Sequence, residues 1–199
     1  MSKRAALAAG AAVVAIGAAG CGASSSSGGG HASKTATANA PEVNPAGDIP
    51  DNQAYVAYTP PGGGFTVKVP EGWARSSAGG AVTFTDKLNT IRVESKAAQA
   101  PLTARDARQT EVPKLASSVS GFRRGTVTAV ARKAGTAVRI TYLAKAKADP
   151  VTGKTGQDAV ERYVFFHNGK DVILTLSGPK GADNVDPWKI VTDSVTWSR

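Results

Sequence analysis

Residues 160–177 read VERYVFFHNGKDVILTLS, and this stretch decides the fold of the chain. Two runs rich in apolar residues flank Asn168-Gly169, the dipeptide that most strongly favours a tight β-hairpin turn. Pairing across that turn places Phe165 opposite Val172 on one side of the hairpin. Apolar side chains also occupy the other side: Val164, Phe166 and Ile173. Since both faces are apolar near the middle, we predict an antiparallel sheet that is covered on both faces.

Further strands are predicted from period-two alternation of apolar and polar residues. The predicted strands and hairpins are a strand over 65–69, a hairpin joining strands around 82–84 and 91–93, and a hairpin joining 126–132 to 137–145. Two helical segments interrupt the strands. We therefore predict an α+β domain with an antiparallel sheet of about six to eight strands and helices packed on its faces, an α/β/α sandwich.

The helical segments are expected from their start signals. Thr103 and Asp106 form a variant of the capping box, which satisfies free N–H groups at a helix start. Pro113 lies within this segment and predicts a kink or two short helices. A last helix is expected to begin with Asp186 as its cap and Pro187 at its first position.

Composition allows one soluble domain with a substantial core, because 41% of the 199 residues are hydrophobic and 20% are charged. The formal net charge is +9. Cys21 is the only cysteine, which excludes an internal disulfide, a thiolate metal cluster and a cysteine nucleophile in the body of the protein.

The first twenty residues have the features of a signal peptide. Lys3 and Arg4 form a positive start, and residues 5–20 carry neither charge nor proline. The run ends Ala18-Ala19-Gly20-Cys21, which resembles the lipobox of bacterial lipoproteins, although Ala18 stands where leucine is usual. This resemblance implies that residues 1–20 are removed and that Cys21 is lipidated. The alternatives are plain secretion after cleavage near Ala23, and an uncleaved anchor.

Residues 21–52 offer almost no apolar side chain to bury, so we predict a flexible tether rich in Ser, Gly, Ala and Pro. A coil of this length has a root-mean-square span of roughly 30 Å. The globular domain is expected to occupy residues 53–199. These segments predict a lipid-anchored protein at the outer face of the cytoplasmic membrane, or a secreted protein if Cys21 is lost.

The globular part opens with Gly64-Phe65-Thr66-Val67-Lys68-Val69-Pro70-Glu71-Gly72-Trp73, followed by two hairpins, an amphipathic helix, the Asn168-Gly169 hairpin and a terminal helix. This opening and this order of elements resemble the PsbP/Mog1-like fold and the actinobacterial lipoproteins that carry it. The resemblance implies a non-catalytic accessory or binding module acting with a membrane or envelope protein complex such as a transporter. Fold alone does not establish function, so this step is an analogy.

No catalytic constellation is found in the sequence. Gly153-Lys154-Thr155 lacks the earlier glycine of a phosphate loop, and Ala148 stands in its place. His167 is the only histidine of the domain, and no Gly-x-Ser-x-Gly elbow accompanies it. We expect no cofactor, no metal site and no enzyme activity, with a hydrolase as a minor alternative. Three tryptophans are candidates for a stacking platform or, as we favour, mainly for the core: Trp73, Trp188 and Trp197.

Basic residues are frequent around the middle hairpin. Arg139, Lys145 and Lys147 share one strand face by parity, and we predict that they contact anionic lipid or wall polymer, or else form a solvated face. Nucleic acid is not an expected partner outside the membrane, and we expect a monomer. A second functional hypothesis is a carrier whose pocket between sheet and helix holds a small apolar or lipid ligand.

Overall fold

The computed structural model describes residues 46–148 and 153–198. The strands, in chain order, are β1 Tyr55–Tyr58, β2 Phe65–Pro70, β3 Ala74–Ala78, β4 Ala81–Asp86, β5 Asn89–Ala97, β6 Arg123–Arg132, β7 Gly135–Lys145, β8 Gln157–His167, β9 Lys170–Pro179 and β10 Thr196–Trp197. The helices are α1 Ala104–Asp106, the π-helical η1 Ala107–Glu111, α2 Val112–Ser118 and α3 Val185–Asp193. These elements confirm the predicted α+β class.

Seven strands form one antiparallel sheet in the order β3-β4-β5-β9-β8-β7-β6. This agrees with the predicted six to eight strands. A second, three-stranded sheet in the order β1-β2-β10 was not predicted, and the strand expected over 65–69 belongs to it as β2.

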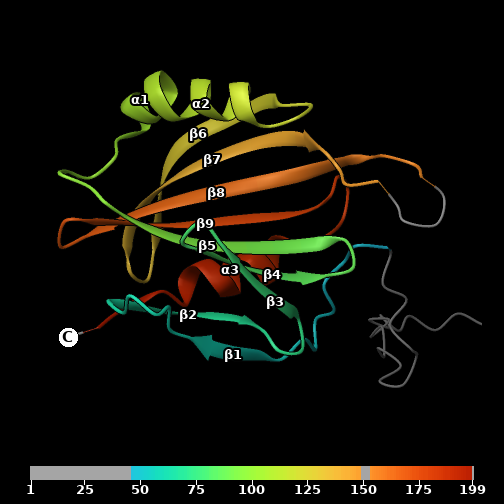
Figure 1. Ribbon diagram of the computed structural model, residues 1–199, viewed down its shortest axis with the longest axis horizontal. Helices are drawn as coiled ribbons and strands as arrows, with labels where there is room; N and C mark the ends of the chain where they lie inside the picture. The colour runs from blue at the N-terminus through green and yellow to red at the C-terminus, as the bar shows by residue number, and fades with distance from the viewer. Residues whose placement is uncertain (1–45, 149–152, 199) are drawn as a thin grey trace, which may run out of the picture. The chain divides into compact units, whose positions relative to one another are not determined.

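The two faces of the seven-stranded sheet are covered by different elements. In Figure 1 the helical run α1–η1–α2 lies over β6 and β7, while α3 and the small sheet lie on the other side. Under the helical run, Val138, Ile140 and Val160 are buried in one apolar cluster. The larger cluster joins inward side chains of the large sheet to α3 and the small sheet, and it includes Phe165 and Val191. The prediction of a sheet covered on both faces is therefore confirmed.

The β8–β9 hairpin has the predicted register, with Phe165 paired to Val172. Asn168 and Gly169 both have positive φ, at 46° and 74°, as a type I′ turn requires. The first predicted hairpin is also present as β4–β5, with a turn of two residues because Asp86 and Asn89 pair with each other.

The helical run around Pro113 is continuous from residue 104 to residue 118, where the sequence predicted a kink or two helices. Thr103 caps it as predicted, because its hydroxyl accepts a hydrogen bond from the Asp106 N–H. The π turn of η1 precedes the proline, and the Val112 N–H donates to the Ala107 carbonyl one residue further back than in an α-helix. The wider turn accommodates a residue that has no N–H to donate.

Two predicted boundaries are wrong. The folded domain begins before residue 53, because Ile49 is 4% exposed and belongs to the larger core cluster. Helix α3 begins at Val185, with Asn184 and not Asp186 at the cap position. The predicted leader, Cys21 and most of the predicted tether lie outside the described residues.

Candidate functional site

A cavity of about 450 Å³ lies between the large sheet and the start of α3, and we call it the α3 cleft. Its floor is formed by Thr141 and Leu143 of β7 with Ala159 and Glu161 of β8. These residues pair directly across the two strands, so their side chains leave the same face of the sheet. The floor is hollow because its side chains are smaller than those further along the same face, where β8 carries the buried Tyr163.

The wall of the α3 cleft is apolar. Val185 and Trp188 of α3 line it, together with Pro179 and Ala182 of the preceding loop. Trp188 is 8% exposed, which confirms the core role favoured for it, whereas Val185 is 72% exposed. A large exposed apolar side chain beside an apolar hollow is typical of a binding surface.

One end of the α3 cleft is closed by buried polar side chains. Asn184 donates to Asn89 Oδ1 and to the Gly47 carbonyl, at 3.0 Å each, and its Oδ1 accepts from the Ile49 N–H at 2.8 Å. Gly178 leaves the space for these amides, since a Cβ there would lie 2.3 Å from Asn89 Oδ1. The cap residue of α3 is therefore used to attach the chain around Ile49 to the sheet.

The mouth of the α3 cleft lies at a β-bulge. Pairing between β6 and β7 shifts register between Arg124 and Val127, and Arg124 and its neighbour Arg123 line the mouth. Gly125 allows a close approach here, because a Cβ would lie 2.4 Å from Thr141 Oγ1. Bulges commonly re-aim side chains beside functional sites.

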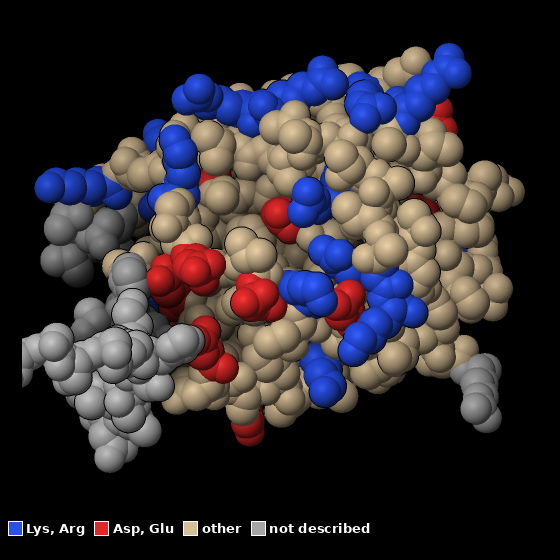
Figure 2. All heavy atoms as spheres, turned by 180° about the vertical axis from the view of Figure 1, so that it is seen from behind, with Lys and Arg blue, Asp and Glu red and all other residues tan. Residues whose placement is uncertain are grey.

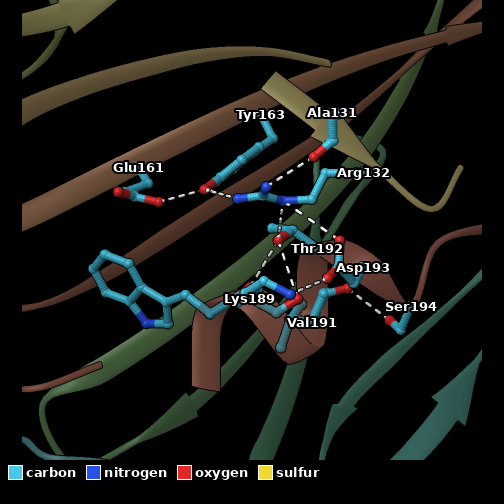
Figure 3. A network of polar contacts seen from close by, with 10 residues as sticks. Ala131, Arg132, Glu161, Tyr163, Lys189, Val191, Thr192, Asp193 and Ser194 are labelled. Atoms are coloured by element: carbon cyan, nitrogen blue, oxygen red, sulfur yellow. Dashed lines mark hydrogen bonds and ion pairs between the residues drawn. The ribbon is translucent and has the colours of Figure 1, made fainter. Parts of the chain in front are cut away.

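A polar network lies beside the cleft and ties α3 to the sheet (Figure 3). Arg132 donates to Tyr163 Oη at 2.9 Å and to Thr192 Oγ1 at 2.9 Å, and its Nε lies 3.8 Å from an Asp193 carboxylate oxygen. The Tyr163 hydroxyl donates to Glu161 at 2.5 Å. Burial raises the pKa of Tyr163, and its hydrogen bond to Glu161 adds to the shift, so this hydroxyl remains a donor.

Charge pairing favours the ionised form of Asp193. The Lys189 ammonium, 2.7 Å away, lowers the pKa of Asp193 through a hydrogen bond, desolvation opposes this shift, and the nearby charges of Arg132 and Lys133 add to it. Arg139 lies 3.6 Å from Glu161. The arrangement fixes the helix and places Glu161 at the cleft floor as a hydrogen-bond acceptor.

A second and larger hollow, of about 880 Å³, lies along the other end of α3. Lys133, Lys189, Ile190 and Trp197 are among its lining residues. Ile190 is 45% exposed. Helix α3 therefore separates two hollows and presents an apolar side chain at each.

The three basic residues predicted to act together do not form one patch. Arg139 is half-buried and paired with Glu161. Lys145 is exposed at the end of β7, and Lys147 lies at a separate hollow with Lys87. Figure 2 shows Lys and Arg in several groups with Asp and Glu between them.

His167 is not at the α3 cleft. Its ring stacks on Trp197, with centroids 4.5 Å apart. Among the described residues there is no group of three or more His, Cys, Asp and Glu side chains able to hold a metal ion. Within the same residues, no helix is both long and apolar enough to cross a membrane.

Sequence reasoning missed the residues that shape the α3 cleft. Asn89 comes from one segment and Gly178 and Asn184 from another, distant one, and the long-range pairing of β5 with β9 makes them neighbours. The one local signal was the small side chain of Ala159, which is typical of an ordinary strand start.

No family model matches the chain, and no curated protein matches it in sequence. Solved structures do match its architecture. Cyanobacterial PsbP (CyanoP) from Synechocystis sp. PCC 6803 superposes with a TM-score of 0.54 at 15% identity, over 77% of this chain and 99% of that one. The chain therefore has the PsbP/Mog1-like fold, as the opening from Gly64 to Trp73 predicted.

Three further structures are similar at lower scores. The Ran-binding protein Mog1p of Saccharomyces cerevisiae has a TM-score of 0.46 at 12% identity, over 72% of this chain and 95% of that one. LpqN of Mycobacterium tuberculosis, described as involved in cell envelope biogenesis, has a TM-score of 0.47 at 14% identity, over 75% and 93%. A Bacteroides thetaiotaomicron protein has a TM-score of 0.46 at 13% identity, over 72% of this chain. The chain spans about half of that protein's length, 48%.

Proposed function

We propose that this protein is a non-catalytic accessory or binding module, anchored through a lipid on Cys21 at the outer face of the cytoplasmic membrane. The basic start at Lys3 and Arg4, the uncharged run over 5–20 and the small residues before Cys21 support the anchor. The domain would act with a membrane or envelope protein complex, for which a transporter is one candidate.

The observation that carries the binding role is the surface of α3. Large apolar side chains exposed in the described residues are Val56, Leu88, Val185 and Ile190. Two of these four belong to one short helix, and each lies beside a hollow. Apolar side chains that are exposed beside a concave surface favour a protein partner that covers them.

Site-specific photocrosslinking in native membranes tests this role. A photoreactive residue replacing Ile190 or Val185 is expected to capture a defined membrane protein. The same residue at Val56 of β1, 42% exposed, is the matched control and is expected to capture none. Equal capture at all three positions, or none at any, would contradict a partner on α3.

The anchor is tested separately by the intact mass of the mature protein from the detergent phase. A lipid-sized increment on a chain that starts at Cys21, lost in Cys21→Ala, is the expected result. An unmodified chain that starts beyond Cys21 would show a secreted protein and refute the anchor.

The α3 cleft favours a second function, a carrier of a small apolar or lipid ligand. Its volume of about 450 Å³ and its apolar wall are in the range of small-molecule sites. Native mass spectrometry of protein released from its own membrane is expected to find a retained ligand, and Ala159→Phe, which fills the floor, is expected to abolish it. Retention that survives this filling would place the ligand elsewhere, and an empty wild-type protein would refute the carrier function.

A further inference from the structure

Five exposed basic residues lie along one edge of the domain, and we call this set the basic edge. They are Arg105, Arg108, Arg123, Arg124 and Lys145. Figure 1 shows the helical run α1–η1–α2 and strand β6 along the upper edge, and Figure 2 shows a row of Lys and Arg there.

Hydrogen bonds hold the elements of the basic edge together. The Arg108 guanidinium donates to the Val127 carbonyl at 2.6 Å, which ties the helical run to β6. The Lys145 N–H donates to the Ser120 carbonyl at 2.8 Å, which ties the end of β7 to the segment between α2 and β6. These contacts hold the helical run, β6 and the end of β7, which carry the five residues, in one rigid unit.

Most other arginines of the described domain differ from the basic edge in their pairing, and the exception is Arg75, which lies over the Tyr58 ring. Arg92, Arg132, Arg139 and Arg162 each lie within 4 Å of a carboxylate. No residue of the basic edge has an ion pair with any described residue. The acidic side chains nearby are engaged elsewhere: the Thr103 hydroxyl donates to Asp106, and Glu111 is buried and paired with Lys114.

The shape of the basic edge suits a flat, negatively charged partner. The helical run of residues 104–118 is about 22 Å long at about 1.5 Å per residue. If this edge lies against a surface, its charges fall within roughly one Debye length of it, about 10 Å at moderate salt. Anionic phosphate groups in a plane are complementary to such a row.

We propose that the basic edge docks the domain onto the phosphate-bearing surface of an anionic lipid bilayer. The choice of a bilayer over a soluble polymer rests on the proposed anchor at Cys21, because a tether with a root-mean-square span of roughly 30 Å keeps the domain close to the membrane. Arg123 and Arg124 also line the mouth of the α3 cleft. Docking therefore turns that mouth toward the bilayer.

The test uses the full chain with Cys21→Ser, so that no acyl chain contributes to binding. Co-sedimentation with vesicles of phosphatidylcholine and phosphatidylglycerol at low salt is compared with pure phosphatidylcholine. Removing two charges with Arg123→Gln and Arg124→Gln is expected to weaken partitioning roughly 25-fold, about fivefold for each residue. The control pair, Lys68→Gln and Lys170→Gln, removes the same charge from exposed positions off the edge and is expected to change partitioning less than about twofold.

Three results would overturn the proposal. Equal loss in both pairs would show an effect of net charge alone. Equal binding to neutral vesicles would show that charge is not involved, and binding to a soluble phosphate polymer but to no vesicle would assign the edge to a wall polymer. Thermal unfolding of each variant verifies its fold. Because every protein lacks Cys21, these results do not depend on whether the anchor exists.

Discussion

Replacing Asn184 by alanine tests whether this side chain attaches the segment before β1 to the large sheet. Asn184 is 3% exposed and makes three hydrogen bonds that join the Ile49 and Gly47 backbone to Asn89. Truncation leaves the Ile49 N–H and Asn89 Oδ1 without these partners, while the Gly47 carbonyl keeps its bond from Asn89 Nδ2 at 2.9 Å.

Each buried polar group left unsatisfied costs about 1–3 kcal/mol. Two such groups give an expected loss of roughly 2–6 kcal/mol in the free energy of unfolding, which urea denaturation measures. The matched control is Asp186→Ala, because the sequence predicted that residue as the cap, yet it is exposed. We expect this control to cost about 0.5 kcal/mol through the helix dipole. Similar losses in the two variants, or a loss below about 1 kcal/mol for Asn184→Ala, would refute the reasoning.

Three further substitutions are predicted. Gly125→Ala should lower the free energy of unfolding by about 1–3 kcal/mol in urea denaturation, because the added Cβ would overlap Thr141. The control Gly62→Ala has open space around it and should be nearly neutral. Equal effects of the two substitutions would contradict the close approach of Gly125 to Thr141. Burial raises the pKa of Asp171 above its ordinary value of 3.8, so the stability that this carboxyl contributes is present in acid and is lost as the pH rises. Asp171→Asn should therefore raise the Tm at neutral pH and give no gain below pH 3.8. A Tm at neutral pH below that of the wild type would refute this. Trp197→Phe removes the indole N–H that donates to the Ala134 carbonyl at 2.9 Å, and should cost about 1 kcal/mol in urea denaturation; no loss would mean that this bond is replaced by water.

Local patterns predicted the elements but not how they come together. Asn168-Gly169 fixed a turn type and therefore a register, since positive φ at both residues is accessible only to a few residue types. The strand over 65–69 was found by alternation, yet its sheet was not, because the short neighbouring strand β1 was not predicted and β10 is far away in the sequence.

The candidate site was even less accessible from the sequence. Arg139 was grouped with Lys145 and Lys147 by parity, and parity is correct for a strand, but Glu161 on the neighbouring strand neutralises Arg139. Lys147 lies beyond the end of β7, where strand parity no longer applies. The position of Asp186 before Pro187 favoured a cap, whereas Asn184 fills that position while its side chain bonds elsewhere.

The strand order also bears on how the molecule folds. Strands β3, β4 and β5 follow one another in the sheet, as do β6 to β9, and the two groups meet only where β5 pairs with β9. That seam joins Thr90 to Ser177, far apart in sequence, so its closure entropy must be overcome before its contacts form. We predict that the local hairpins acquire protection from hydrogen exchange first and that the β5–β9 seam is the slow step. Pulsed exchange showing that the β5 amides bonded to β9, and not those bonded to β4, are protected as early as the amides of the β8–β9 hairpin would exclude this order.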